Sequence, residues 1–466
     1  MKHDVSRREI LAYTSGTVIL GSTIPTAAAD DERGPPEDRG RGDLVEVNVG
    51  YRGERGRDVA ADAAADVRRN FSFDAMTIRV PEQAIQGLEN NPNVRYVEEN
   101  ETVEVKPLAT AAQTANSVSV SDDGREVPWG IDRIGALGAR ERGLTGDGTN
   151  IAVLDTGIDP NHPDIESNLG EGVAFIECTD GEELWDWFPD DFECAIEWDD
   201  DFLWSTLGHG TPVAAITSAS LNAGITSIAP ESTVHPVKMA SLAYTEEDPG
   251  DEGHVGLSSL SIIAESIDWT KQTGQEVANM SFGFFTESEL VHDAVKSAAE
   301  SGVLLVAGAG NENVDEDSFQ YDGEAPVGYP AAYDEVIAVS ATNEDDEFAW
   351  FSSFGPEVDI TAPGEDLLLA EITYTDEEYS KNSGTSFASP HVAGAGALLM
   401  ANGLTADEAR QRLLDTAEDI GLPPKNGVPG CSTCGLLSTT CSHRSRRRAC
   451  STPSTTPGRC SPAGGA

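Results

Sequence analysis

Three short motifs carry a carboxylate, an imidazole and a hydroxyl, the groups that nucleophilic hydrolysis combines. Asp155 lies in AVLDTGID, His209 in GHGTPVAA and Ser386 in NSGTSFASPHVAGAGALL. A serine hydroxyl becomes a nucleophile when an imidazole accepts its proton, and a buried carboxylate holds that imidazole in the correct tautomer. These three side chains are therefore candidates for a nucleophile, its base, and the acid that orients the base.

Each motif also has a structural explanation when it is taken alone. An aspartate at a strand end can cap a helix or form a turn, a lone histidine is more often structural, and Gly-Thr-Ser before a helix is often an N-cap. The three motifs together, in the order Asp, His, Ser, favour catalysis. Pro212, three residues after His209, fits the first turn of a helix, where its missing N–H has no partner.

A run of alternating strands and helices would position these groups. Apolar strands are predicted in NIAVLDTG, STVHPVKMA, EVANMSFG, VLLVAGAG and DEVIAVSAT, and helices in LSSLSIIAESIDWTKQTG and SELVHDAVKSAAESG. This alternation predicts an α/β fold with a parallel sheet covered by helices on both faces. Working residues of such sheets lie at the carboxyl ends of the strands, and Asp155, Ser281 and Asn311 each follow one.

A second pattern precedes this one. Within residues 43–106, LVEVNVG, AMTIRV and VRYVEEN predict strands, whereas residues 58–70 and PEQAIQGLENNP predict helices. The β-α-β-α-β order predicts a small two-layer module. Residues 107–126 are small and polar, which predicts an exposed linker that is easily cut.

The composition is strongly acidic. The 466 residues hold 81 acidic and 30 basic side chains, for a formal net charge of −51. This charge argues against a nucleic-acid partner, which needs a basic surface. Hydrophobic residues make up 39% of the chain, so disorder is disfavoured. We interpret the excess of acidic residues as adaptation to high salt, and an acidic calcium-storage protein is the alternative interpretation.

The first residues predict export. Arg7 and Arg8 precede a short apolar stretch, and Ala27 to Ala29 offer a cleavage site, so residues 1–29 resemble a twin-arginine signal peptide. An ordinary signal with a chance arginine pair is the alternative. Residues 30–42 form a short acidic Gly/Pro segment. No later run of about 20 apolar residues exists, so we expect a secreted protein with no membrane span.

The motifs together resemble the subtilisin-like serine proteases, and among them the secreted halophilic halolysins. DTGID, HPD, GHGT, NMSFG, AGN and GTSFASPHVAG carry the resemblance, and the Asp, His, Ser order is that of subtilisin. It covers about residues 43–420. The resemblance implies a parallel sheet of about seven strands between helices, an inhibitory propeptide at 43–106, a maturation site within 107–126 and a catalytic domain at 127–420.

The resemblance also implies roles. Asp155 orients His209, His209 is base and acid, and Ser386 attacks a polypeptide substrate through an acyl-enzyme, with no cofactor needed for the chemistry. Asn311, otherwise a turn residue, would stabilise the oxyanion together with the backbone N–H of Ser386. Two segments would bind substrate and favour a bulky apolar residue before the scissile bond: Asn279, Ser281, Phe282 and Gly283, with Ala307, Gly308, Ala309 and Gly310.

Further expectations concern metals, cysteines and partners. Asp164 matches an aspartate that holds structural calcium in the family. Cys178 and Cys194 could form a disulfide, worth about 3 kcal/mol, or stay as free thiols. Acids between and after these cysteines could bind calcium or form a salt-adapted surface, which we favour. The propeptide is the expected intramolecular inhibitor, and a monomer is the default expectation.

The last segment departs from the family. Residues 421–466 hold five of the seven cysteines and no acid. Cys431, Cys434, Cys441 and His443 suggest zinc, but the spacing is loose, and a shifted reading frame near residue 425 is our preferred hypothesis. A catalytically inactive, subtilase-like binding protein is therefore the alternative function. An esterase is disfavoured because G-x-S-x-G is absent around Ser386.

Overall fold

The computed structural model describes residues 44–107, 127–175, 208–220, 224–244, 254–313, 326–373 and 379–422. The predicted signal peptide, the segment 30–42, the linker from 108 onward, the pair Cys178 and Cys194, and the tail from 423 onward lie outside these residues. The proposals for those segments therefore stay predictions.

A seven-stranded parallel sheet forms the centre of the larger domain, as predicted. The strand order is β15-β14-β13-β11-β6-β8-β7, and every neighbouring pair is parallel. The strands are β6 (Asn150–Asp155), β7 (Val173–Ala174), β8 (Thr233–Lys238), β11 (Val277–Met280), β13 (Leu304–Gly308), β14 (Ile337–Thr342) and β15 (Ile360–Pro363).

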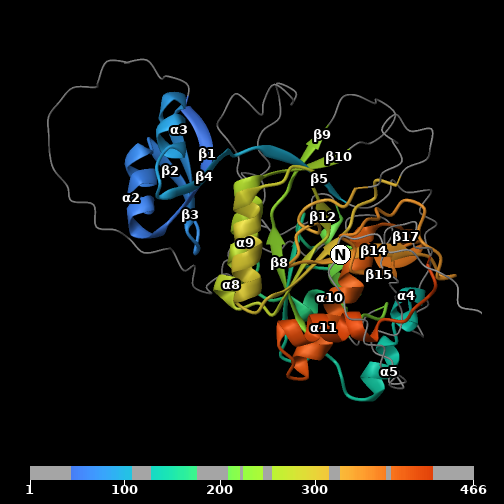
Figure 1. The fold of residues 1–466 in the computed structure, drawn as a ribbon. Coiled ribbons are helices and arrows are strands. Elements are labelled where there is room, and N and C mark those ends of the chain that lie inside the picture. The colour runs from blue at the N-terminus through green and yellow to red at the C-terminus, as the bar shows by residue number, and fades with distance from the viewer. Residues whose placement is uncertain are drawn as a thin grey trace, which may run out of the picture. The chain divides into compact units, whose positions relative to one another are not determined.

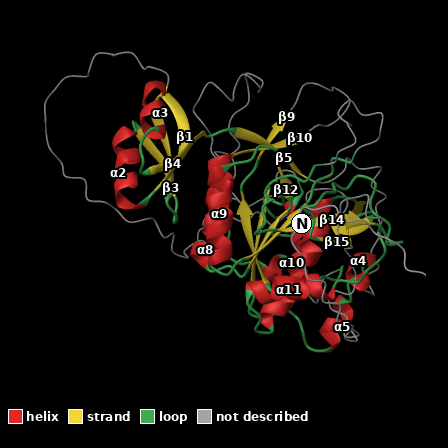
Figure 2. Cartoon of the chain, viewed as in Figure 1, coloured by secondary structure: helices red, strands yellow, loops and turns green. Residues whose placement is uncertain are grey.

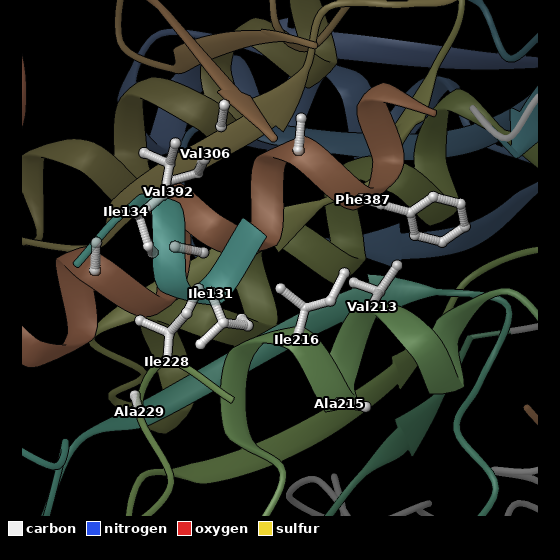
Figure 3. Close-up of a cluster of buried hydrophobic side chains, with 14 of the residues drawn as sticks. Ile131, Ile134, Val213, Ala215, Ile216, Ile228, Ala229, Val306, Phe387 and Val392 are labelled. Atoms are coloured by element: carbon white, nitrogen blue, oxygen red, sulfur yellow. The ribbon is translucent and has the colours of Figure 1, made fainter. Parts of the chain in front are cut away.

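Helices cover both faces of this sheet (Figure 2). Successive side chains of β6 point to opposite faces, so Ile151 and Val153 belong to one buried cluster while Ala152 and Leu154 belong to the other. Figure 3 shows part of the first cluster, including Ile216 of α7 and Val392 of α10. Helices α7 (Gly210–Ser218), α10 (Thr385–Ala401) and α11 (Ala406–Thr416) lie on that face, and α8 (Leu260–Thr273) and α9 (Glu289–Glu300) on the other.

Shorter elements complete the domain. Helices α4 (Trp129–Arg133) and α5 (Ala136–Glu141) precede the sheet, the 3-10 turn η1 (Glu166–Asn168) follows β6, and β16 (Leu367–Ala370) pairs with β17 (Tyr379–Asn382). Arg133 of α4 makes an ion pair with Asp346 at 2.6 Å and another with Glu418 at 3.3 Å. The pair with Glu418 connects the start of the domain to its last described segment.

The first module is a four-stranded antiparallel sheet with two helices. Its order is β2-β3-β1-β4, from β1 (Leu44–Tyr51), β2 (Asp66–Asn70), β3 (Ala75–Pro81) and β4 (Val94–Glu99), with α2 (Gly53–Ala63) and α3 (Glu82–Glu89). The prediction of a helix over residues 58–70 is wrong in its second half. Residues 66–70 form β2 because they pair with β3 and because Arg69 is buried in an ion pair with Glu265 at 2.7 Å.

A second four-stranded sheet was not predicted. Strand β5 (Thr102–Pro107) lies between β12 (Phe282–Gly283) and β10 (His254–Ser259), and β9 (Ser241–Tyr244) pairs with the far edge of β10. Figure 1 shows these strands next to one another. Helix α8 begins at Leu260, after the N-cap Ser259, so the residues just before it extend a strand rather than the predicted helix.

Candidate active site

The predicted site residues meet at one edge of the parallel sheet. Asp155 is the last residue of β6, Ser281 follows β11, and Asn311 lies just after β13. These are the carboxyl ends of three neighbouring strands. His209 immediately precedes α7, and Ser386 is the second residue of α10.

Asp155 and His209 are hydrogen bonded and buried. The imidazole Nδ1 lies 2.9 Å from Oδ1 and 3.1 Å from Oδ2 of the carboxylate. The backbone N–H and hydroxyl of Thr156 also donate to Asp155 Oδ1, at 2.7 and 3.1 Å. An imidazole that donates from Nδ1 keeps a lone pair on Nε2. His209 Nε2 is buried and has no hydrogen-bond partner among the residues that the structure describes.

Two glycines allow His209 this position. Gly208 has a φ of +71°, which favours glycine. A Cβ on Gly210 would lie 2.1 Å from the carbonyl oxygen of Gly157, so any side chain would collide with the loop after β6. Pro212 lies in the first turn of α7, as predicted. The Gly-His-Gly motif therefore brings the start of α7 close against the end of β6.

Ser386 exchanges hydrogen bonds with Ser281. The Ser386 hydroxyl donates to the Ser281 carbonyl at 3.0 Å, and the Ser281 hydroxyl donates to the Ser386 carbonyl at 2.8 Å. Pro390 explains the second bond, because it stands four residues after Ser386 and has no N–H for that carbonyl. The backbone N–H of Ser386 has no intrahelical acceptor, since it lies in the first turn of α10.

Thr385 orients the Asn311 side chain. Asn311 Oδ1 accepts from the backbone N–H of Thr385 at 3.0 Å and from its hydroxyl at 3.1 Å. Thr385 Oγ1 in turn accepts from the N–H of Gly310 at 3.2 Å. These bonds engage the oxygen end of the amide, so its NH₂ end points away from Thr385. We did not predict a role for Thr385, although its place directly before Ser386 was the available signal.

The predicted substrate-binding residues form two groups, and the first lies in and just after β11. Phe282 and Gly283 form a strand that pairs with β5. Asn279 is fully buried, and its amide donates to the Ser281 hydroxyl at 2.8 Å, so it supports the neighbourhood of Ser386 from inside.

The second predicted wall follows β13. Ala307 and Gly308 end that strand, and the backbone N–H of Ala309 donates to the carbonyl oxygen of Val339 at 2.8 Å. Gly310 has a φ of +121°, and a Cβ there would lie 2.8 Å from Ser353 Oγ. This tight turn brings Asn311 back toward the start of α10.

Among the described residues, Asp164 is surrounded by hydrogen-bond donors. Its Oδ1 accepts from the backbone N–H of Gly224 at 2.7 Å, and its Oδ2 accepts from the backbone N–H of Ile225 at 3.3 Å. The Tyr379 hydroxyl contacts both carboxylate oxygens at 3.1 Å. Calcium needs six to eight oxygen ligands, whereas these neighbours are hydrogen-bond donors. No group of three or more His, Cys, Asp or Glu that could hold a metal occurs in the described part of the chain.

The parallel α/β fold and the site at its strand ends define a serine hydrolase. The family model for Peptidase S8, the subtilase family, matches residues 146–434, and the chain belongs to this family. It is accordingly a serine endopeptidase, and proteases of this family act on polypeptides. Within the described residues, no helix is both long and apolar enough to cross a membrane.

Named relatives agree with this assignment. The chain is 34% identical over 356 residues to the minor extracellular protease Epr of Bacillus subtilis, and 33% identical over 357 residues to an alkaline protease of Alkalihalobacillus alcalophilus. It is 34% identical over 304 residues to subtilisin Savinase of Lederbergia lenta. These matches cover 76%, 75% and 64% of this chain. They span 47% of Epr, which is about half its length, and 76% and 93% of the other two.

Proposed function

We propose that this chain is the zymogen of a secreted, salt-adapted endopeptidase of the halolysin type, with Asp155, His209 and Ser386 as its catalytic triad. The observation that carries the proposal is the buried hydrogen bond between Asp155 and His209 Nδ1, with Nε2 left to accept a proton. Ser386 lies at the start of a helix beside two candidate oxyanion donors. Catalysis of this kind needs no cofactor.

The proposed reaction has two halves. His209 Nε2 takes the proton of the Ser386 hydroxyl as Oγ bonds to the scissile carbonyl carbon. The amide N–H of Asn311 and the backbone N–H of Ser386 stabilise the oxyanion, and the leaving amine takes the proton from His209. Water then attacks the acyl-enzyme with His209 again as base, and Asp155 stabilises the imidazolium in both halves.

Ser386 must turn before it reacts. Its hydroxyl donates to the Ser281 carbonyl, not to His209. A substrate strand that continues along β12 would offer its own N–H to that same carbonyl. We infer that substrate binding displaces the hydroxyl toward His209 Nε2, because catalytic hydrogen bonds commonly tighten only in the substrate complex.

The specificity proposal rests on small residues. Gly283, Ala307, Gly308, Ala309 and Gly310 leave room beside the extended substrate for a large side chain. We therefore expect cleavage after bulky apolar residues. A cleavage profile from a peptide library would contradict this if acidic residues or proline dominated the position before the cut.

The first module is proposed to be the inhibitory propeptide. Glu98 accepts from the Ser288 hydroxyl at 2.8 Å and from the N–H groups of Glu289 and Leu290 at 2.9 and 3.2 Å, and so caps helix α9. Asn100 accepts from the N–H of Ser261 at 3.0 Å at the start of α8. Burial raises the pKa of Glu98. Strand β5 would occupy the cleft as a substrate does.

Secretion and salt adaptation complete the proposal. The Arg7-Arg8 segment supports export by a twin-arginine route, and the net charge of −51 supports function in concentrated salt. A monomer that acts on polypeptides is the simplest form of such an enzyme. We expect casein hydrolysis to rise steeply with salt concentration.

Active-site labelling tests the proposal. A fluorophosphonate probe in high salt should label the wild-type chain, and Ser386→Ala should abolish labelling together with casein hydrolysis. Asn311→Ala should keep the label but lose most turnover. A folded wild-type chain that takes no label and cleaves no casein would favour the alternative, an inactive subtilase-like binding protein.

A further inference from the structure

A short strap lies against the glycine that precedes His209. Residues 371–373, called the strap here, directly follow strand β16. A Cβ placed on Gly208 would lie 3.3 Å from Ile372 Cδ1, and 3.7 and 3.8 Å from two further carbons of that side chain, and Ile372 is buried. The strap therefore closes one side of the turn that carries the proposed base.

The carboxylate of Asp159 holds the strap. Its Oδ2 accepts from the backbone N–H of Thr373 at 2.7 Å and from the Thr373 hydroxyl at 2.6 Å. Asp159 is fully buried, whereas Thr373 is exposed. A role in turn formation explains Oδ1, which accepts from the backbone N–H of Asn161 at 2.9 Å. It does not explain Oδ2, whose bonds reach across 214 residues of sequence to the strap.

The same residue also contacts the other side of the His209 turn. The backbone N–H of Asp159 donates to the Thr211 hydroxyl at 2.9 Å, in the first turn of α7. Thr211 is fully buried, and the side chain of His209, the N-cap residue, makes no capping bond to that turn. The start of α7 therefore takes its position from the loop after β6.

We propose that Asp159 is a positioning residue for the reaction, because it fixes both sides of the His209 turn and so holds the imidazole within reach of Ser386. This inference rests on the proposed function. The Asp159 carboxylate keeps Ile372 against Gly208, and the Asp159 N–H keeps the start of α7 in place. Both halves of the reaction use His209, and a misplacement of about 1 Å can cost about 100-fold in rate.

Steady-state kinetics on a chromogenic peptide tests the assignment. Thr373→Val removes the hydroxyl donor but keeps the backbone donor, and it should lower kcat by about 10-fold. Asp159→Asn makes an NH₂ group face a donor whichever way the amide turns, and it should lower kcat by about 100-fold. KM should change by less than about twofold in both, because the predicted substrate-binding segments follow β11 and β13 and not the strap.

Two matched variants serve as controls. Thr373→Ser keeps the hydroxyl and should retain most of the wild-type kcat. Thr273→Val removes another exposed threonine hydroxyl, which donates to the Trp269 carbonyl at 2.8 Å within α8, and should leave kcat unchanged. An unchanged kcat in Thr373→Val, or an equal loss in Thr373→Ser, would overturn the proposal.

Proton NMR separates positioning from a general loss of structure. In the inactive Ser386→Ala background with isotope-labelled histidine, the Nδ1 proton that His209 donates to Asp155 reports on the imidazole directly. Its resonance should shift in Thr373→Val and Asp159→Asn but stay in place in Thr273→Val. An unmoved resonance in both strap variants would overturn the proposal even if kcat fell.

The NMR measurement also keeps this inference apart from the proposed function, because it needs no catalysis. If the folded wild-type chain takes no fluorophosphonate and cleaves no peptide, the proposed function fails, and a shifted resonance would still show that Asp159 positions the imidazole. If labelling and cleavage are normal but Thr373→Val behaves like the wild type, only the role of Asp159 and the strap fails.

Discussion

Ser281 and Ser386 are joined by two reciprocal hydrogen bonds, each hydroxyl donating to the other residue's carbonyl. Ser281→Ala removes the donor to the Ser386 carbonyl, which Pro390 cannot replace. A buried acceptor without a partner costs about 1–3 kcal/mol, so we expect that loss in urea unfolding and a lower kcat. Ser389→Ala is the control, since Ser389 contacts the Ser281 hydroxyl at 3.1 Å but not this carbonyl. Equal losses in both variants would contradict the prediction.

Asn311→Ala and Thr385→Val should both lower kcat, but by different factors. Asn311→Ala removes a proposed oxyanion donor and should lower kcat by about 10²–10³ with little change in KM. Thr385→Val removes the hydroxyl that contacts Asn311 Oδ1 and should lower kcat by about 10- to 100-fold. Thr385→Ser keeps that hydroxyl and should retain most activity. Steady-state kinetics on a chromogenic peptide measures all three, and a change confined to KM would argue against oxyanion stabilisation.

Stability around Asp164 should depend on a tyrosine rather than on calcium. The hydroxyl of Tyr379 contacts both carboxylate oxygens, so Tyr379→Phe should lower the free energy of unfolding by about 1.5–3 kcal/mol. EDTA should leave the melting temperature of the Ser386→Ala protein unchanged at constant salt. A large drop in melting temperature with EDTA that Asp164→Asn abolished would instead identify Asp164 as a calcium ligand.

The buried His391 should make the fold sensitive to acid. Its Nδ1 contacts the Phe387 carbonyl at 2.7 Å, and burial lowers its pKa from 6.5 to about 4. Between these values the unfolded chain binds a proton that the native state does not, so stability falls as the pH falls. The loss attributable to this group should reach about 2–3 kcal/mol at pH 4.5.

A comparison of two proteins isolates that effect from the many titrating carboxylates. In the Ser386→Ala background, the unfolding free energies of the parent and of a His391→Gln variant are measured in urea at pH 7, 5.5 and 4.5. The parent should lose more stability than the variant over this range. Parallel pH profiles would show that His391 does not titrate as its burial requires.

The parts of the site that lie at the ends of apolar strands were predictable from the sequence. The strands ending at Asp155 and before Ser281 and Asn311 are short runs of buried residues, and parallel pairing brings their carboxyl ends together. The start of α7 was predictable from the two glycines around His209 and from Pro212. The local pattern was sufficient here because each element's apolar residues determine both its type and its burial.

Features that depend on distant partners were not predictable in this way. Residues 66–70 continue an alanine-rich helical pattern, yet they form a strand because β3 and Glu265 are there to pair with them. The pairing of β5 joins it to β10, about 150 residues away, and to β12, about 175 residues away, and a one-sequence pattern contains no signal for it. Tyr379, one hydrogen-bond partner of Asp164, is likewise 215 residues away from it.

The position of β5 has a consequence for the mature enzyme. If the first module is cut off and released, as proposed, β10 and β12 become two exposed edges separated by the width of one strand. Only a peptide that can straighten over several residues can fill that space. The enzyme should therefore select its targets first by how readily they unfold locally, and proteins that stay tightly folded in brine should escape it even when they display suitable leucines.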